Sequence, residues 1–388
     1  MAGVEAESAV PGIRVALAAG DAEVTIGGGD ALRLTGVGGA PAVEVAVGRT
    51  AVLLPAGGAV AVRVDGRTVA TTASLEVAPA DPDGLIRVSG RDYRGGLTVL
   101  PVPQGLLAIN RVSLEEYLAG VVNAEMGRRG PGEDAALEAQ AIVSRTYALR
   151  AIGRWRARAY DVVATVSDQA YGGVGAETAG GRDAVLTTRG AVLTHEGQPI
   201  EAFFHSTCGG RTAAGEEVFS GGGLPYLRSA SDAGPGGESW CALSPRFRWS
   251  ESWAGEGLRA ALRAALAAAG QSNGDPGDVR DVVVTGRTPS GRVQSLGLAT
   301  ARGTVPVTGP SVRQALPPAP GQLLRSAAFE LQITREGSQI VRMVVSGRGA
   351  GHGVGLCQWG AVGRARAGAT REQILMAYFP GTRLERRW

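Results

Sequence analysis

The segment SLEEYLAGVVNAEMGRRGPGEDAALEAQAIVSRTYAL, residues 113–149, is the stretch around which the rest of the chain is organised. Ser113 is followed three residues later by Glu116, the spacing of a capping box, in which two side chains satisfy backbone N–H groups at a helix start. Apolar residues then recur at the spacing of one buried helix face. These residues are Leu114, Tyr117, Leu118, Val121 and Val122. The pattern predicts a helix that begins at this point.

Glu125 falls on the same face, three and four residues beyond Val122 and Val121. A carboxyl group above an apolar stripe loses hydration, and this loss raises the pKa of the carboxyl group. A raised pKa suits a general acid that works near neutral pH. The alternative is a glutamate at a helix end that turns into solvent just before Gly127. Spacing alone leaves both interpretations open.

A second helix is predicted after Pro131. Glu133 and Asp134 favour a helix N-terminus, and five alanines between residues 135 and 148 allow the helix to pack closely on a neighbour. Polar side chains on an otherwise small and apolar helix usually face a cleft or the backbone of another element. On this helix they are Gln140, Ser144, Arg145 and Tyr147.

The first hundred residues have a different pattern. Short β-prone runs alternate with glycine, proline and aspartate at intervals of about eight to twelve residues, which is typical of an antiparallel β domain. The runs are IRVAL, EVTI, LRL, VEVAV, AVLL, VAVRV, SLEV, LIRV, LTVL and LLAI, between residues 13 and 109. We find no catalytic constellation among them, so this domain is interpreted as a structural or binding appendage.

Composition sets further bounds. Among 388 residues, 60 glycines and 20 prolines indicate many turns, while a hydrophobic content of 44% argues against disorder. The net charge of +3 favours no nucleic-acid partner. No apolar run is long enough to span a membrane, and the segment MAGVEAESAVPG has neither the basic nor the apolar region of a signal peptide.

Four further motifs follow the two predicted helices. They are DQAYGG at 168–173, AFFHSTCGGRT at 202–212, PYLRS at 225–229 and GRGAGHGVGLCQWGA at 347–361. With LEEYLAGVVNAEMG and ALEAQAIVSRTYAL, these motifs stand in the order found in the stage II sporulation protein D family, also called the SpoIID/LytB domain family. From about Leu106 to its C-terminus the chain resembles this family, whose members act on bacterial peptidoglycan.

The β-prone runs predict a β-rich domain at 13–110. The resemblance adds a mixed α/β SpoIID-like domain at 111–388 that carries an inserted α+β unit at about 249–329, so the expected fold class is α+β. Within the insert, AGEGLRAALRAALAAAG is predicted to be an amphipathic helix, and VRDVVVTGRTPSGRVQSLGLAT a hairpin. Residues 1–12 are expected to be disordered or added for expression. Because the family works in the envelope, we expect an exported protein whose signal or anchor sequence is missing from this chain.

The resemblance also implies an activity. The first hypothesis is a lytic transglycosylase that cleaves the MurNAc–GlcNAc bond of glycan strands stripped of their peptides. Glu125 would protonate the glycosidic oxygen and then deprotonate the 6-hydroxyl of the sugar, which requires no metal. The second hypothesis is a non-catalytic amidase enhancer of the LytB type, which binds glycan and stimulates a separate amidase. The third is an inverting hydrolase with Asp168 or Glu201 as the second carboxylate.

Residues inside the matched motifs are the candidates for binding the glycan. They are Arg145, Tyr147, Gln169, Tyr171, His205, Ser206, His352 and Gln358. His205 and His352 are two of only three histidines in the chain, and we expect them to hydrogen-bond a sugar or to orient Glu125. Ser206 as a hydrolytic nucleophile is disfavoured, because no nucleophile-elbow pattern surrounds it.

The glycine-rich loop at 347–355, GRGAGHGVG, lies between a strand and a helix and superficially resembles a Gly-x-Gly-x-x-Gly pattern. A dinucleotide site needs a parallel strand with an acidic ribose ligand further on, but only about 30 residues follow this loop. A phosphate loop of the Walker type needs a lysine, and the chain has none. The loop is therefore interpreted as a tight turn that presents His352.

The three cysteines permit two interpretations. Some family members bind zinc through a His- and Cys-rich segment just before the position of Asp168, but here that segment reads DVVATVSDQAYGG and has no such ligands. The first interpretation is a disulfide, Cys208 to Cys241, with Cys357 reduced. The second is a structural zinc ion held by Cys208, Cys241, Cys357 and His205. An odd cysteine count favours the second slightly, and both stay open.

Overall fold

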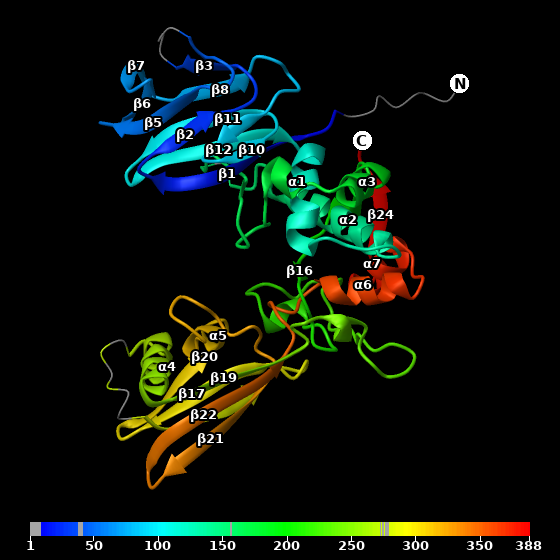
Figure 1. Cartoon of the computed structure of the whole chain (residues 1–388). Coiled ribbons are helices and arrows are strands. Elements are labelled where there is room, and N and C mark those ends of the chain that lie inside the picture. Colours follow the sequence, from blue (N-terminus) through cyan, green and yellow to red (C-terminus); the bar gives the residue numbers. More distant parts are fainter. Residues whose placement is uncertain (1–8, 38–41, 156, 272, 274, 276–278) are drawn as a thin grey trace. The chain divides into compact units, whose positions relative to one another are not determined.

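The computed structural model describes residues 9–37, 42–155, 157–271, 273, 275 and 279–388. The chain forms two compact units (Figure 1). The first unit comprises Met1–Ala202 and Arg383–Trp388, and the second comprises Phe203–Thr382. Helices and strands are mixed along the chain, so the α+β class is as predicted. Of the N-terminal segment predicted to be disordered or added, residues 1–8 lie outside the described residues, and Gly12 is the first residue of β1.

In the described residues of its N-terminal part, the first unit has twelve strands (Figure 1). They are β1 (Gly12–Asp21), β2 (Val24–Gly27), β3 (Leu32–Gly36), β4 (Val43–Val45), β5 (Thr50–Ala56), β6 (Ala59–Val64), β7 (Arg67–Thr72), β8 (Leu75–Pro79), β9 (Ile86–Val88), β10 (Arg91–Tyr93), β11 (Gly96–Val102) and β12 (Gly105–Ser113). Each predicted β-prone run overlaps one of these strands, while β7 and β10 were not predicted. Both are short of apolar residues, and β10 has only three residues.

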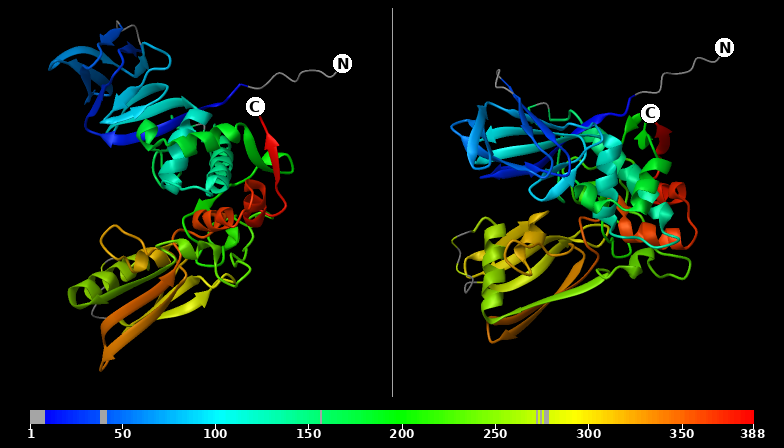
Figure 2. Two further views of the ribbon diagram at one scale, coloured as in Figure 1. Left: turned by 45° about the vertical axis from the view of Figure 1, so that its right-hand side comes forward. Right: turned by 45° about the horizontal axis from the view of Figure 1, so that its top comes forward.

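These strands form two sheets. One has the order β13-β1-β12-β11-β8-β3-β4, where β13 is Val162–Val163, and the other has the order β10-β9-β2-β5-β6-β7. Strand pairs within them are antiparallel, except that β13 runs parallel to β1. The sheets contact each other through β5 and β12 and through β6 and β11, as the turned views illustrate (Figure 2). In strands such as β5 and β6, alternate residues are buried, as in a β sandwich.

Strand β12 runs directly into the first helix, α1 (Leu114–Met126). The backbone N–H of Glu116 donates to the hydroxyl of Ser113 at 3.4 Å, and that hydroxyl donates to the Glu116 carboxylate at 2.6 Å. The predicted helix start is confirmed, although the carboxylate accepts from the hydroxyl rather than from the backbone. The N–H of Leu114 donates to the carbonyl of Pro11 at 2.8 Å, which ties the helix to the start of β1.

The rest of the first unit packs around this helix. It contains α2 (Asp134–Ala151), η1 (Gly173–Ala176), α3 (Ala179–Thr187), β14 (Ala191–His195), β15 (Gln198–Pro199) and β24 (Arg383–Arg386). Helix α1 contacts α2, α3 and η1. Strand β24, from the end of the chain, pairs antiparallel with β14. The last residues of the chain therefore belong to the same unit as the two helices that organise it.

In the second unit, two motif segments that are far apart in sequence lie side by side. Strand β16 (Phe204–His205) runs parallel to β23 (Leu356–Cys357), and Thr207 exchanges backbone hydrogen bonds with Ala350. The remaining elements here are η2 (Gly215–Glu217), η3 (Trp240–Leu243), α6 (Gln358–Arg366) and α7 (Arg371–Tyr378). At the start of α7, Thr370 and Gln373 form a capping box.

In the sequence, the inserted unit lies between these two motif segments, and it has its own apolar core. It comprises β17 (Arg248–Ala254), α4 (Gly255–Ala268), β18 (Val279–Arg287), β19 (Val293–Thr300), β20 (Gly303–Thr308), α5 (Ser311–Ala315), β21 (Phe329–Glu336) and β22 (Gln339–Arg348). Two three-stranded sheets, β17-β22-β21 and β18-β19-β20, share one apolar core with α4 (Figure 2). This core extends from Trp249 to Val345, so it includes β22 as well as the insert predicted at 249–329.

No helix in the described ranges is both long enough and apolar enough to cross a membrane.

Candidate functional site

Glu125 lies in the last turn of α1 and is half-buried. Its Oε1 accepts a hydrogen bond from the backbone N–H of Ala170 at 2.6 Å. Ala170 belongs to the DQAYGG motif, so a segment distant in sequence fixes the position of the carboxyl group. The spacing left two interpretations open. This hydrogen bond agrees less well with the one in which Glu125 turns freely into solvent.

Asp168, the first residue of the DQAYGG motif, anchors the motif to its surroundings. Asp168 accepts from the hydroxyl of Tyr147 at 2.7 Å and from the backbone N–H of Val163 at 2.8 Å. Burial, followed by the hydrogen bond to Asp168, raises the pKa of Tyr147. Tyr147 thus stays a neutral hydroxyl that donates to the Asp168 carboxylate, which fixes the start of the motif on α2.

Gln169 and Tyr171 are buried, and their polar atoms are used inside the protein. Gln169 Oε1 accepts from the hydroxyl of Tyr117 at 3.2 Å, and the hydroxyl of Tyr171 donates to Asn110 at 2.9 Å. The rings of Tyr117 and Tyr171 are in tilted contact, with centroids 4.9 Å apart. These residues were predicted to bind the glycan, but in this structure their polar atoms bond to other buried side chains and hold the motif in place.

Arg145 differs in the same way from its predicted role. It is fully buried, and its guanidinium is paired with the carboxylate of Glu115 at 2.8 Å. Burial lowers the pKa of Arg145, and the hydrogen bonds that Arg145 donates to Glu115 oppose this shift. A side chain with no exposed surface cannot touch a glycan, so Arg145 holds the helices together instead.

The two carboxylates considered as partners for Glu125 both have other partners. Asp168 is engaged by Tyr147 and Val163, as described above. Glu201 is paired with Arg150 at 2.8 Å and lies 3.6 Å from a guanidinium nitrogen of Arg154. Neither arrangement resembles a carboxylate that is poised to activate a water molecule.

In the second unit, the ring of His352 is fixed by two backbone groups. Its Nδ1 accepts from the N–H of Val354 at 3.1 Å, so the proton of the neutral ring is on Nε2, which donates to the carbonyl of Phe204 at 2.8 Å. Burial lowers the pKa of His352 to about 4. His352 is therefore neutral at physiological pH and clamps the glycine-rich loop to β16.

His205 is buried in the same cluster. Its ring lies 5.5 Å from that of His352, centroid to centroid, and its Nδ1 is 3.1 Å from the carbonyl of Val354. Since only a protonated nitrogen can donate to a carbonyl, Nδ1 carries the proton and Nε2 is bare. Nε2 is buried and has no hydrogen-bond partner among the described residues. Burial holds the pKa of His205 well below its usual value.

The remaining candidates lie next to the same strands. Ser206 is half-buried, with its Oγ 3.3 Å from Thr207 Oγ1, and its backbone carbonyl accepts from the N–H of Trp359. Gln358 is the first residue of α6 and is largely buried. Neither histidine contacts Ser206 through a hydrogen bond that would activate its hydroxyl.

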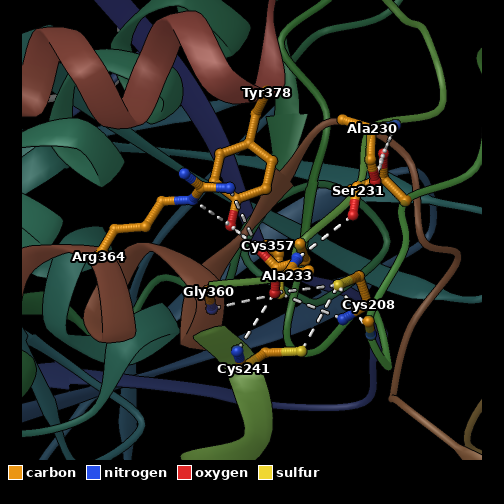
Figure 3. Close-up of polar contacts among 12 residues, drawn as sticks. Cys208, Ala230, Ser231, Ala233, Cys241, Cys357, Gly360, Arg364 and Tyr378 are labelled. Carbon is orange, nitrogen blue, oxygen red and sulfur yellow. Dashed lines mark hydrogen bonds and ion pairs between the residues drawn. The ribbon is translucent and has the colours of Figure 1, made fainter. Parts of the chain in front are cut away.

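The three cysteines, far apart in sequence, meet in the second unit (Figure 3). Cys208, Cys241 and Cys357 are all buried and reduced. Together with Asp232 they place one ligand atom each within 4.8 Å of the others. We call these four residues the cysteine cluster. The fourth member is Asp232 and not His205, which corrects the ligand set predicted from the sequence.

Asp232 is fully buried, and its two oxygens have different partners. Oδ1 accepts from the hydroxyl of Tyr378 at 2.6 Å and lies 3.7 Å from the guanidinium of Arg364. Oδ2 accepts from the backbone N–H of Cys241 at 3.2 Å and lies 3.4 Å from Cys208 Sγ. One oxygen is thus held by side chains while the other faces the sulfur atoms.

The crowding of these acidic groups shifts their pKa values. The Cys241 thiol raises the pKa of Cys208, the Cys208 thiol lowers that of Cys241, and burial raises that of Cys357. Burial also raises the pKa of Asp232 to about 7. Four negative charges cannot coexist in this volume without a cation, so the protein alone favours only partial ionisation.

The sequence offered little to identify Asp232. It stands in the segment SASDAGPGG, nine residues before Cys241, and follows no ligand spacing such as Cys-x-x-Cys. The only local signal was an acidic residue in a turn-rich segment close to the PYLRS motif.

The inserted unit contacts the same motif segment. Arg292, which precedes β19, is buried, and its Nη2 donates to the carbonyls of Cys208 at 3.2 Å and Arg211 at 3.0 Å. The indole N–H of Trp249 donates to the carbonyl of Gly349 at 2.9 Å. The insert therefore supports the segments that carry the cysteine cluster and the glycine-rich loop.

Comparison with known proteins matches two parts of the chain to family models. Residues 103–195 match a family described as "Stage II sporulation protein". Residues 242–355 match a domain of unknown function (DUF8618). The first match spans α1, α2 and the DQAYGG motif, and the second spans the inserted unit and the glycine-rich loop.

Comparisons with individual proteins point to the same family. The chain is 31% identical to the stage II sporulation protein D of Bacillus subtilis over 297 residues, which cover 71% of this chain and 76% of that protein. It is 28% identical to an uncharacterized protein of Brachyspira hyodysenteriae over 296 residues, 76% of this chain and 72% of that protein. It is 27% identical to the amidase enhancer of Bacillus subtilis, over 69% of this chain and 40% of that protein. The chain belongs to the stage II sporulation protein D family.

Proposed function

We propose that the protein acts on the bacterial cell wall, as a lytic transglycosylase that cleaves the MurNAc–GlcNAc bond of peptidoglycan, with Glu125 as its acid and then its base. The observation that carries this proposal is the position of Glu125. The residue is partly exposed, and its carboxyl oxygen is held 2.6 Å from the backbone N–H of Ala170. Glu125 also lies in a matched family motif, and its carboxyl group is held in place by the backbone of a second motif.

The chemistry needs one group that changes roles. The protonated carboxyl of Glu125 donates its proton to the glycosidic oxygen as the bond from that oxygen to C1 of MurNAc breaks. The resulting carboxylate then takes the proton of the C6 hydroxyl, whose oxygen bonds to C1 and closes a 1,6-anhydro ring. The carboxyl group is thereby regenerated, and no water is consumed.

This scheme agrees with the surroundings of Glu125. Because the sugar supplies its own nucleophile, no second carboxylate is required, and Asp168 and Glu201 are both engaged by other groups. Positioning by a rigid neighbour is what a proton-transfer group needs, since small displacements reduce the rate strongly. The buried residues Gln169 and Tyr171 supply that rigidity. The scheme requires no metal for catalysis.

The substrate would place the protein in the cell envelope, where peptidoglycan is found. We propose glycan strands stripped of their peptides as the preferred substrate. The active protein is then expected after export.

The experiment is digestion of purified denuded glycan, followed by mass spectrometry of the products. The wild type should release fragments that end in 1,6-anhydro-MurNAc. Glu125→Gln keeps size and polarity but cannot transfer the proton, so the rate should fall by about 100-fold or more. Glu116→Gln is the matched control, because it makes the same change at an exposed position of the same helix, and its rate should stay near that of the wild type. Reducing ends in the products would instead indicate hydrolysis.

A second function is favoured by the relative named amidase enhancer. A protein of this kind would bind glycan and stimulate a separate peptidoglycan amidase without cleaving glycan itself. The two functions give different results in one assay series. If the wild type leaves denuded glycan intact but accelerates peptide release by an added amidase, and Glu125→Gln does so equally, the enhancer function holds and the transglycosylase proposal is rejected.

A further inference from the structure

The cysteine cluster has the chemical composition of a metal site. It combines three thiols and a carboxylate, all buried, with their ligand atoms within 4.8 Å of one another. Thiolates are soft ligands that select zinc and similar metals, and zinc also accepts a carboxylate oxygen.

The spacing of the sulfur atoms fits a shared ion better than a covalent bond. Cys208 Sγ and Cys241 Sγ are 3.5 Å apart. A disulfide requires about 2.05 Å, whereas two sulfurs of a tetrahedral zinc site with bonds of 2.3 Å are about 3.8 Å apart. A disulfide between these two residues would also leave the third buried thiol, Cys357, beside it without a role.

Backbone N–H groups are directed at the sulfur atoms. Cys208 Sγ accepts from the N–H of Gly210 at 3.4 Å, and Cys357 Sγ accepts from the N–H groups of Cys208 at 3.1 Å and Gly360 at 3.3 Å. Cys357 is also the N-cap of α6, where the helix dipole favours a negative charge. These contacts stabilise thiolates, the form that binds a metal, and fix where each sulfur lies.

The carboxylate of Asp232 is oriented for one-oxygen coordination. Oδ1 is occupied by Tyr378 and Arg364, and Oδ2 faces the sulfurs. Partners of this kind around a ligand fix its orientation and tune its affinity for the metal. At Gly360, any side chain would collide with the hydroxyl of Tyr378 and the Asp232 carboxylate, so the close approach of α6 depends on this glycine.

We propose that Cys208, Cys241, Cys357 and Asp232 together bind one structural zinc ion. Four protein ligands in a buried site leave no open coordination position, which is the arrangement of a structural rather than a catalytic zinc. The ion ties three segments together: the AFFHSTCGGRT motif, the loop that ends in η3, and the start of α6. The proposal is independent of the transglycosylase activity, since it rests on the second unit alone.

The first experiment uses the wild-type protein purified without chelators. Elemental analysis should find about one zinc per chain, and a thiol reagent should modify the cysteines slowly until a chelator is added. Removal of the zinc should lower Tm by about 10 °C or more, and added zinc should restore it. Replacement by cobalt(II) should give the charge-transfer absorption of thiolate ligands. Metal-free protein with three cysteines that react at once, or with a disulfide that responds only to reductant, overturns the proposal.

A pair of variants identifies the fourth ligand. Asp232→Asn keeps the shape of the side chain but is a much weaker ligand, so zinc affinity should fall by about 10-fold or more while the cobalt spectrum keeps its thiolate bands. His205→Gln is the matched control, because this residue lies in the same motif but outside the cluster, and its zinc affinity should be unchanged. Loss of zinc from His205→Gln but not from Asp232→Asn would refute Asp232 as a ligand. Competition with a coloured chelator measures both affinities even where a variant is less stable.

Discussion

Arg145 and Glu115 form a buried ion pair in which all five N–H groups of the guanidinium have acceptors. Nε and Nη2 donate to the two carboxylate oxygens of Glu115, and the remaining three bonds go to Thr188, Val185 and Ala191. Glu115 Oε1 also accepts from the backbone N–H of Gly190 and, at 2.9 Å, from the indole of Trp388. One guanidinium therefore joins α1, α2, α3 and β14, and its carboxylate partner reaches the end of the chain.

Replacing Arg145 by lysine should destabilise the first unit by about 3 kcal/mol, because an ammonium group cannot satisfy Glu115 and three other acceptors at once. Arg150→Lys is the matched control. Arg150 lies on the same helix, but it is half-exposed in its ion pair with Glu201, and its replacement should cost less than about 1 kcal/mol. Urea unfolding measures both values. Equal effects of the two substitutions would contradict the structural role assigned to Arg145.

Much of the local structure was predictable because it depends on neighbours in sequence. The capping pair Ser113–Glu116 and the apolar spacing after it placed the start of α1 correctly. The leucines of the insert, Leu258, Leu262 and Leu266, predicted the buried face of α4. In each case the signal and the structure lie within one or two helix turns, where side-chain geometry is nearly fixed.

The roles of the site residues were harder to predict, because they depend on tertiary partners. Arg145 read as a candidate for glycan binding, since nothing in its own helix shows that Glu115, thirty residues earlier, would bury it. Asp232 was missed for the same reason: its partners Tyr378 and Arg364 come from helices near the end of the chain. Burial and pairing of charged groups are properties of the assembled core, and no periodicity in the sequence carries them.

Gly355→Ala should destabilise the second unit by about 3 kcal/mol. The residue has φ of 74°, and an added Cβ would collide with the carbonyl of Phe203, so backbone strain adds to overpacking. The control is Gly368→Ala, where φ is 86° but an added Cβ meets no neighbour, and only about 1 kcal/mol is expected. Thermal unfolding compares the two. If Gly355→Ala is as stable as Gly368→Ala, the loop approaches β16 less closely than this structure shows.

Arg292→Ala tests whether the insert supports the motif segment. It leaves the carbonyls of Cys208 and Arg211 without this donor in a buried setting, which should cost about 3 kcal/mol. Arg302→Ala, at the exposed turn between β19 and β20, is the control and should change stability by less than about 0.5 kcal/mol. Limited proteolysis of Arg292→Ala should also cut the 206–212 segment faster. If Arg292→Ala resists the protease as well as Arg302→Ala does, the insert does not support the motif segment.

His352 should make stability depend on pH. Its folded pKa is about 4, lowered first by burial and further by the charges of Arg313 and Arg292, whereas a histidine in the unfolded chain titrates near 6.5. Between these values the unfolded state takes up a proton that the folded state refuses. The free energy of unfolding therefore falls as the pH drops through this window, and it regains its full value above about pH 6.5.

His352→Gln removes this contribution. From pH 7.5 to pH 5, the loss of stability should be smaller in the variant than in the wild type by about 2 kcal/mol. His205 faces the same cluster, and burial holds its pKa down as well, so some pH dependence in the same direction will persist. The comparison uses urea unfolding at a series of pH values, and the measured quantity is the slope, which a uniform loss of stability does not change. Parallel curves for the two proteins would mean that the His352 ring accepts a proton in the folded state as readily as in the unfolded chain, and that its clamp between Val354 and Phe204 does not enforce the neutral form.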